Sequence, residues 1–203
     1  MTIRKRRPWG TPGRLGASGI VISRDACASA LLAEARAARR ALPEFGLVGG
    51  DLCATLGGLG REEHLHGPDA RRYPVDLGIA VADGVEYVFV AHVIVRRRWW
   101  RGRIVAAMNA QWYGSWDLGP KSHPNDGLLD VSDATLRFAD KLAARRRVKT
   151  GTHVPHPDIA VRRTAEASFD FDPASLLEVD GVAVGTVRHL EVSVEPDAFE
   201  VVI

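Results

Sequence analysis

The chain of 203 residues has few cysteines, few lysines and no long apolar run. Its two cysteines, Cys27 and Cys53, lie among small and apolar residues without an export signal, so we expect reduced thiols rather than a disulfide. The basic segment 1–10 is not followed by the apolar stretch that an export signal requires. No run approaches the roughly 20 apolar residues that span a bilayer. We therefore expect a cytoplasmic protein without a transmembrane segment.

A strong net charge is also missing, since the formal value is only +2. This balance argues against a nucleic-acid partner. The basic residues are 23 arginines and 4 lysines, a bias typical of a GC-rich genome, so arginine clusters are weak evidence of function. The densest cluster, residues 96–103, contains Trp99 and Trp100. It suits a nucleic acid or a membrane surface. We favour instead a solvated turn whose tryptophans pack on a sheet or a second subunit, which leaves a homo-oligomer open.

Residues 1–60 predict a small α/β unit behind an irregular N-terminal arm. Residues 20–22 are a short β-branched run, and residues 26–41 form an alanine-rich segment with apolar residues on one face. A second apolar run at 45–48 leads to a glycine pair and a short helical segment at 52–56. This alternation of strands and helices indicates a reduced α/β lobe.

Residues 61–203 predict a mainly antiparallel β domain, a sandwich or barrel. Asp83-Gly84 is typical of a two-residue hairpin turn. One helix is expected, at residues 134–148, because this segment is rich in alanine, leucine and arginine. The expected strands are residues 75–81, 85–95, 104–112, 127–131, 159–164, 165–171, 176–179, 183–194 and 199–203. The fold class is therefore α/β followed by all-β.

Three short motifs follow one another along the chain: Gly49-Gly50-Asp51, Asn125-Asp126-Gly127-Leu128-Leu129 and Asp180-Gly181. Each of them alone predicts only a turn. In this order and at these spacings they resemble the diacylglycerol-kinase-type lipid kinases, the family that includes bacterial lipid kinases and sphingosine kinases. The resemblance runs from about residue 20 to residue 203. It implies a nucleotide-type α/β lobe, a lipid-kinase-like β-sandwich, ATP as substrate if the protein is active, and a nucleotide or lipid as ligand.

The resemblance places the nucleotide site at Gly49, Gly50 and Asp51, where backbone N–H groups at a helix start can hold phosphate. Gly50 stands where the family has asparagine, so one hydrogen-bonding side chain is missing. Upstream, Asp25 matches the aspartate of the family's Gly-Gly-Asp-Gly-Thr phosphate loop. The glycines of that loop are replaced, as by Ser23, and with them the close backbone approach that glycine permits.

The resemblance assigns catalytic roles to Asp25, Asp76 and Asp180. Asp76 opens an Asp-Leu-Gly motif that in the family lies near the catalytic metal. Val182 stands where the family has its proposed general base, a glutamate, and a valine side chain cannot accept a proton. Glu178 is close in sequence, but it would have to reach the site by a different route.

The resemblance also implies a structural Mg²⁺ site, with Asp126 and the carbonyl oxygens of His123 and Leu128 as ligands. Oxygen ligands of this kind suit a hard cation. The residues by themselves indicate only an Asn-Asp-Gly turn, and a single carboxylate binds weakly unless its loop is rigid.

Together these observations favour a divergent lipid-kinase-like protein that is catalytically impaired, a pseudoenzyme acting in ligand or partner binding. One alternative is an active ATP-dependent diacylglycerol or lipid kinase with a rearranged base. A second alternative is a nucleic-acid or membrane-surface binder that uses the segment 96–103. The sequence leaves the identity of the lipid or other ligand open.

Overall fold

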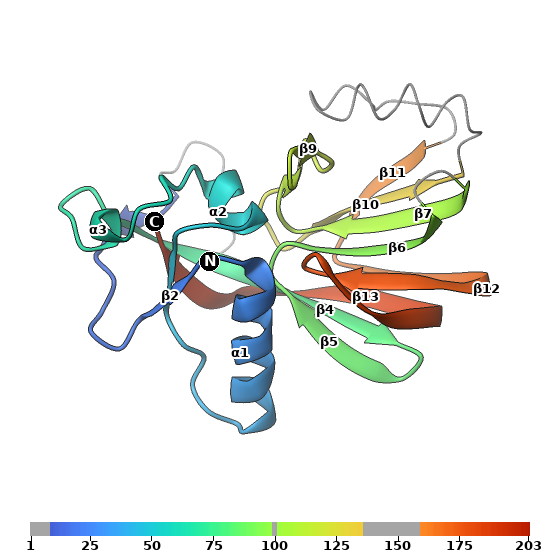
Figure 1. Cartoon of the computed structure of the whole chain (residues 1–203), viewed down its shortest axis with the longest axis horizontal. Coiled ribbons are helices and arrows are strands. Elements are labelled where there is room, and N and C mark those ends of the chain that lie inside the picture. The colour runs from blue at the N-terminus through green and yellow to red at the C-terminus, as the bar shows by residue number, and fades with distance from the viewer. Residues whose placement is uncertain (1–8, 99–100, 136–158) are drawn as a thin grey trace.

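A computed structural model describes residues 9–98, 101–135 and 159–203 (Figure 1). Within this part, no helix is long and apolar enough to cross a membrane. A small N-terminal α/β region is followed by a large antiparallel β domain, as the sequence predicted.

The N-terminal region is a compact β-α-β unit with two further short helices. The buried apolar residues of α1 are Ala28, Leu32 and Ala35, whose spacing matches the helical period. The strands β2 and β3 pair in parallel, as expected when a helix connects them. The elements are β1 (Thr11–Pro12), β2 (Ile20–Ile22), α1 (Asp25–Ala37), β3 (Phe45–Leu47), α2 (Asp51–Leu56) and α3 (Glu62–Leu65).

The β domain contains long strands joined mostly by tight turns. Its elements are β4 (Arg71–Ala82), β5 (Val85–Phe89), β6 (His92–Arg98), β7 (Arg101–Met108), β8 (Trp112–Tyr113), β9 (Trp116–Asp117), β10 (Leu129–Ala134), β11 (Ile159–Thr164), β12 (Glu166–Val179) and β13 (Val182–Val202). The main strand order is β1-β4-β13-β12-β6-β7-β10-β11, with β5 at β4 and a separate β8-β9 pair. The Asp83-Gly84 hairpin prediction is confirmed, since these two residues have φ angles of 48° and 85° and join β4 to β5.

Several predicted strands fuse or divide in the structure. Residues 165–171 and 176–179 belong to one strand, β12, and residues 183–194 and 199–202 belong to β13. Irregular pairing at Asp170/Ser175 and at Glu195/Phe199 lets each long strand bend while it stays hydrogen-bonded. The run 85–95 instead divides into β5 and β6, because the chain turns at residues 90–91.

The helix predicted for residues 134–148 does not begin at Ala134. This residue ends β10, where it pairs with Ile104 on one side and Ile159 on the other. Sheet pairing therefore overrides local helix propensity there. The rest of that segment, from residue 136, lies outside the described residues, as do Trp99 and Trp100.

Two main apolar cores support the molecule. The β-domain core lies among β4, β5, β6, β7, β10, β12 and β13 and includes Phe169, Leu177 and Leu190. The other core brings Leu32 and Phe45 of the N-terminal region against β4 and the end of β13. In addition, β3 pairs in parallel with the last residues of β13. The division into residues 1–60 and 61–203 stays a prediction, because this core and this pairing join the two stretches.

Candidate functional site

Four ionisable side chains meet where the N-terminal region contacts the β domain: Asp25, Asp51, His92 and Asp180. We call them the junction cluster. They come from the start of α1, the start of α2, the start of β6 and the β12–β13 turn. Three of them are assigned to sites by the sequence, but His92 is not. Tertiary structure thus brings together residues that are up to 155 positions apart, as with Asp25 and Asp180, whose charges interact.

Asp25 caps the beginning of α2. Its carboxylate accepts hydrogen bonds from the backbone N–H groups of Asp51 and Leu52, the latter at 3.3 Å. Gly50, the residue directly before α2, has a φ of +92°. A Cβ atom at this position would come within 2.5 Å of the Asp25 carboxylate. Only glycine fits this position. The backbone that the resemblance assigned to phosphate therefore already holds a carboxylate of the same chain.

Asp180 fixes the connection between β5 and β6. Its carboxylate oxygens accept the N–H groups of Val90, Ala91 and His92 at 2.9, 2.9 and 3.0 Å. The backbone N–H of Asp180 donates in return to the carbonyl of His92 at 2.9 Å. Asp180 has a φ of 45° and precedes Gly181, so the turn that the sequence predicted there is present. Its side chain satisfies three backbone donors that are buried.

His92 joins the β domain to α2. Its Nε2 lies 2.9 Å from Oδ2 of Asp51, and the other oxygen of Asp51 accepts the N–H of Gly114 at 2.8 Å. The imidazole is only 1% exposed, and its Nδ1 has no hydrogen-bond partner within the described part of the chain. Burial lowers the pKa of His92, but the hydrogen bond to Asp51 and the charges of Asp180, Asp51 and Asp25 together raise it above its ordinary value.

The crowding of carboxylates also changes Asp25. Burial, followed by the negative charge of Asp180, raises the pKa of Asp25 to about 7, although the N–H of Asp51 acts in the opposite direction. The junction cluster can therefore hold or release a proton near neutral pH. Strongly perturbed groups of this kind concentrate at functional sites, although structural networks produce them as well.

A second polar group, Tyr113, Glu178 and Arg96, lies beside the junction cluster. The ring of Tyr113 is 5.0 Å from the ring of His92. Its hydroxyl donates to Glu178 at 2.6 Å, and Arg96 donates to the other oxygen of Glu178 at 2.8 Å. Burial and the bond to Glu178 raise the pKa of Tyr113 to about 12. Glu178, the nearby substitute for the missing base, is thus engaged by two partners.

Asp76 makes its polar contacts elsewhere, with the loop that precedes β10 and with the bend in β13. Its carboxylate accepts the N–H of Gly127 at 2.7 Å and of Asp197 at 2.8 Å. The side chain is fully buried, and burial raises its pKa to about 6. Asn109 connects Asp76 to the β5–β6 connection that Asp180 fixes. Its Nδ2 donates to the carbonyls of Asp76 and Val90, both at 2.9 Å.

The loop expected to hold Mg²⁺ has its carboxylate engaged by other groups. Asp126 accepts the N–H of Leu128 at 3.0 Å with one oxygen and a bond from Arg163 with the other. His123 uses its ring nitrogen to accept the N–H of Asn125 at 3.2 Å. Among the described residues, no group of three or more histidine, cysteine, aspartate or glutamate side chains is placed to hold a metal. As arranged, the carboxylate of Asp126 is already paired with the cationic side chain of Arg163, which disfavours a divalent cation at this loop.

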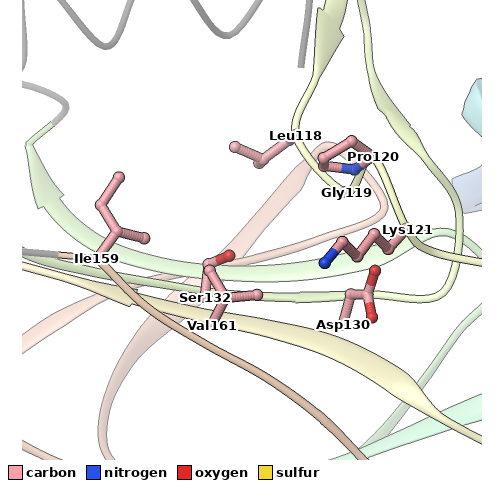
Figure 2. A pocket seen from close by; sticks show the side chains of 8 residues that line it. All are labelled: Leu118, Gly119, Pro120, Lys121, Asp130, Ser132, Ile159 and Val161. Atoms are coloured by element: carbon pink, nitrogen blue, oxygen red, sulfur yellow. The ribbon is translucent and has the colours of Figure 1, made fainter. Parts of the chain in front are cut away.

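A small hollow of about 360 Å³ opens between the loop after β9 and strands β10 and β11 (Figure 2). Leu118 and Pro120 face Val161 across it. Lys121 and Asp130 lie together at one end, from the loop and from β10. Its lining is mainly apolar, and none of the residues predicted as catalytic takes part in it.

Residues 66–203 match the profile of a protein family described as the YegS C-terminal NAD kinase beta sandwich-like domain. The chain belongs to this family. No curated protein is similar enough to this chain to count as a match. The match to the YegS C-terminal domain begins just after α3 and contains the whole β domain together with Asp76, Asp126 and Asp180.

Solved structures with the same fold come from Bacillus anthracis str. Sterne. Two are described as a "putative diacylglycerol kinase" and one as a diacylglycerol kinase. They are 13%, 14% and 14% identical to this chain, with TM-scores of 0.67, 0.66 and 0.61. Each alignment covers 91% of this chain and 77%, 77% and 75% of the other. At such identity the similarity shows the fold, including the YegS C-terminal sandwich, and nothing more.

Sequence reasoning missed His92 and Arg163. His92 interrupts the apolar stretch between Val88 and Val95, and a buried ionisable residue in such a run calls for a partner. That signal was available from the sequence. Arg163 offered none, because its partners Asp126 and Asp130 depend on the pairing of β10 with β11.

Proposed function

We propose that this chain is a catalytically impaired member of the diacylglycerol-kinase-like family, and that it acts by binding a small ligand or a partner rather than by transferring phosphate. The observation that carries the proposal is the carboxylate of Asp25 on the N–H groups of Asp51 and Leu52. These are the donors that a nucleotide phosphate would use in this place. A phosphate could bind there only by displacing the buried carboxyl group of Asp25.

The charge of the junction cluster points the same way. Asp25, Asp51 and Asp180 place three carboxylates together, with His92 as the basic partner. Phosphoryl transfer depends chiefly on cations and donors that neutralise the transferred group. The negative charge of these carboxylates disfavours phosphate binding unless further cations bind together with the phosphate.

The missing base supports the proposal independently. Val182 is the first residue of β13, and its side chain is 49% exposed directly after the Asp180-Gly181 turn. It offers no proton acceptor, and a general base contributes typically 10²–10⁴-fold in rate. Glu178 is held by Arg96 and Tyr113 instead of facing a free site.

A working ATP-dependent lipid kinase is the second candidate, because one observation favours it. Asp25, Asp51 and Asp180 do converge, and the pKa of Asp25 near 7 lies in the range suited to acid–base catalysis. In this case Mg²⁺ and ATP would enter together at the junction cluster, with Asp76 acting from strand β4. Phosphate would then have to bind after Asp25 had moved or had taken up a proton.

The nucleic-acid or membrane-surface alternative finds less support. Arg96 pairs with Glu178, and Arg103 pairs with Asp133 through two hydrogen bonds of 2.8 and 2.6 Å. Arginines engaged in this way are less available to phosphate groups. Titration of the purified chain with oligonucleotides and anionic vesicles at several salt concentrations would reveal such binding through its salt dependence.

The decisive experiment measures transfer of radiolabelled phosphate from ATP to a panel of diacylglycerol and sphingosine-like lipids in the presence of Mg²⁺. We expect no turnover above a heat-denatured control. Turnover of about 1–100 s⁻¹, as is typical of kinases, that is abolished by Asp25→Asn and by Asp180→Asn would overturn the proposal. Calorimetric titration with ATP and with lipid vesicles then separates binding without transfer from no binding at all.

A further inference from the structure

We infer that the guanidinium of Arg163 occupies the place of a divalent cation at the loop before β10, so that this loop is closed by the chain's own positive charge and needs no metal. The guanidinium bridges two carboxylates. Its Nη2 bonds to Asp126, and its Nε donates to Oδ1 of Asp130 at 2.8 Å. This is the role that a metal ion would fill between two acidic side chains.

All four oxygens of these two carboxylates are engaged. Asp126 accepts the N–H of Leu128 with its remaining oxygen, at 3.0 Å. Asp130 accepts the hydroxyl of Ser122 with its own, at 3.2 Å. A divalent cation would therefore have to share oxygens that already accept hydrogen bonds, and it would face the positive charge of Arg163.

The sheet holds the guanidinium in this position. Arg163 lies directly opposite Asp130 in the antiparallel pairing of β11 with β10. The side chain of Asp130 is 5% exposed and that of Asp126 18% exposed, whereas Arg163 reaches them from a site that is 39% exposed. A planar guanidinium with several fixed donors can bridge two carboxylates in a way that a lysine ammonium cannot match.

The bridge has a consequence for the neighbouring strand. The same loop supplies the N–H of Gly127 to the buried Asp76 of β4. Arg163 thus stabilises the loop that satisfies Asp76, and this attachment should be independent of metal. If the guanidinium is removed, Asp126 and Asp130 are left as two adjacent carboxylates without their cation, which is the arrangement that Mg²⁺ or Ca²⁺ selects.

The test compares thermal unfolding of the full chain and of Arg163→Met in EDTA and in millimolar MgCl₂ or CaCl₂, with NaCl added to match ionic strength. The wild-type melting temperature should not respond to either cation. Arg163→Met should melt lower in EDTA and recover about 2–4 °C at a cation concentration roughly five times its dissociation constant. The recovery should disappear in Arg163→Met combined with Asp126→Asn.

Arg103→Met is the matched control. Arg103 also makes two hydrogen bonds to a carboxylate between neighbouring strands, and it is similarly exposed at 36%. Within the described part of the chain, Asp133 is the only carboxylate that is hydrogen-bonded to Arg103. Loss of this arginine should therefore lower the melting temperature without creating any response to divalent cations.

A second readout uses Tb³⁺ luminescence excited through tryptophan. The ring of Trp9 packs 4.3 Å from the ring of His123, so an ion in this loop would lie near a sensitising indole. Sensitised emission that depends on Asp126 should appear in Arg163→Met and not in the wild type. Stabilisation of the wild type by Mg²⁺ that is lost in Asp126→Asn would overturn the inference, and so would a folded Arg163→Met that responds to no cation. If Arg163→Met does not fold, the wild type and Arg163→Lys are compared instead. The melting temperatures of both should be insensitive to the divalent cations.

Discussion

The N-terminal α/β region and the β domain share a core but differ in which backbone N–H groups their acidic motif residues accept. At the start of α2, the phosphate-type backbone of the N-terminal region is filled by Asp25. In the β domain, Asp180 and Asp76 each satisfy buried or turn backbone N–H groups, three and two respectively. An aspartate with such a role stabilises the fold whether or not the protein is a kinase. The presence of Asp76 and Asp180 is therefore weak evidence for activity.

The junction cluster and the loop before β10 also differ in how their carboxylates are neutralised. In the junction cluster, the basic partner is His92, whose charge depends on pH. In the loop before β10, it is Arg163, which stays charged at all ordinary pH values. The difference predicts that the junction between the regions is sensitive to pH, whereas the loop is held permanently.

The largest expected effect tests whether the two regions unfold together. Phe45 of β3 is fully buried, and its ring packs edge-on against Phe199 of β13 at 6.2 Å. Phe45→Ala should lower the free energy of unfolding by about 3–5 kcal/mol, because it leaves a cavity in the core that both regions share. Urea denaturation followed by far-UV circular dichroism and by tryptophan fluorescence should still give one coincident transition. Two separate transitions would show that the two regions unfold as independent domains.

A smaller effect concerns the pH dependence of stability. The pKa of Asp25 rises from 3.8 to about 7 on folding, so the folded protein holds this proton more tightly than the unfolded chain. The resulting stabilisation is complete below about pH 4 and is lost as the pH rises through about 7. This group therefore lowers the free energy of unfolding by about 3 kcal/mol as the pH rises from 4 to 7. The raised pKa of His92 acts in the same direction, since that contribution is present below its ordinary pKa and is lost as the pH rises through the folded value.

Urea denaturation of the wild type and of Asp25→Asn at intervals from pH 4 to pH 8 measures this contribution. The free energy of unfolding should fall less steeply with pH in Asp25→Asn. Asp69→Asn, at an exposed position, serves as the control and should follow the wild type. Parallel pH profiles for Asp25→Asn and the wild type would show that the junction carboxylate is not strained by its neighbours.

The smallest effect concerns a threonine hydroxyl that links the two regions. The hydroxyl of Thr55 in α2 accepts the N–H of Gln111 at 3.0 Å, just before β8, and donates to the carbonyl of Asp51 at 2.7 Å. Thr55→Val keeps the shape and removes both bonds, so we expect a loss of about 1 kcal/mol. Chemical denaturation of the two proteins under identical conditions measures the difference. An unchanged free energy of unfolding would show that Thr55 does not contribute to the attachment of α2 to the β domain.

Much of the fold could be predicted from the sequence because its signals are local. Alternating β-branched residues indicated most strands, and Asp83-Gly84 and Asp180-Gly181 indicated the two tight turns with positive φ angles. The bends within β12 and β13 could not be predicted in this way. A bulge is set by the partner strand and the core beneath it, and the sequence there reads as an ordinary break between two strands.

The candidate functional site was likewise only partly predictable from the sequence. Asp25, Asp51 and Asp180 could be selected from motifs, whereas their convergence on His92 depends on contacts across the whole chain. The expected phosphate position at Gly50 illustrates the limit. Its glycine was visible in the sequence, but the reason for it, the carboxylate of Asp25 in the space of a Cβ atom, was not.

By itself, the sequence determined the class of fold, the order of its two regions and the family resemblance, because these depend on local propensity, hydrophobic period and short motifs. The tertiary structure alone decided what each charged residue does. It placed a carboxylate on the backbone of α2, set His92 between aspartates, and paired Arg163 with two carboxylates of the loop before β10. The physical reason is that electrostatic roles depend on distance and burial, and both are fixed only when strands and helices distant in the chain pack together.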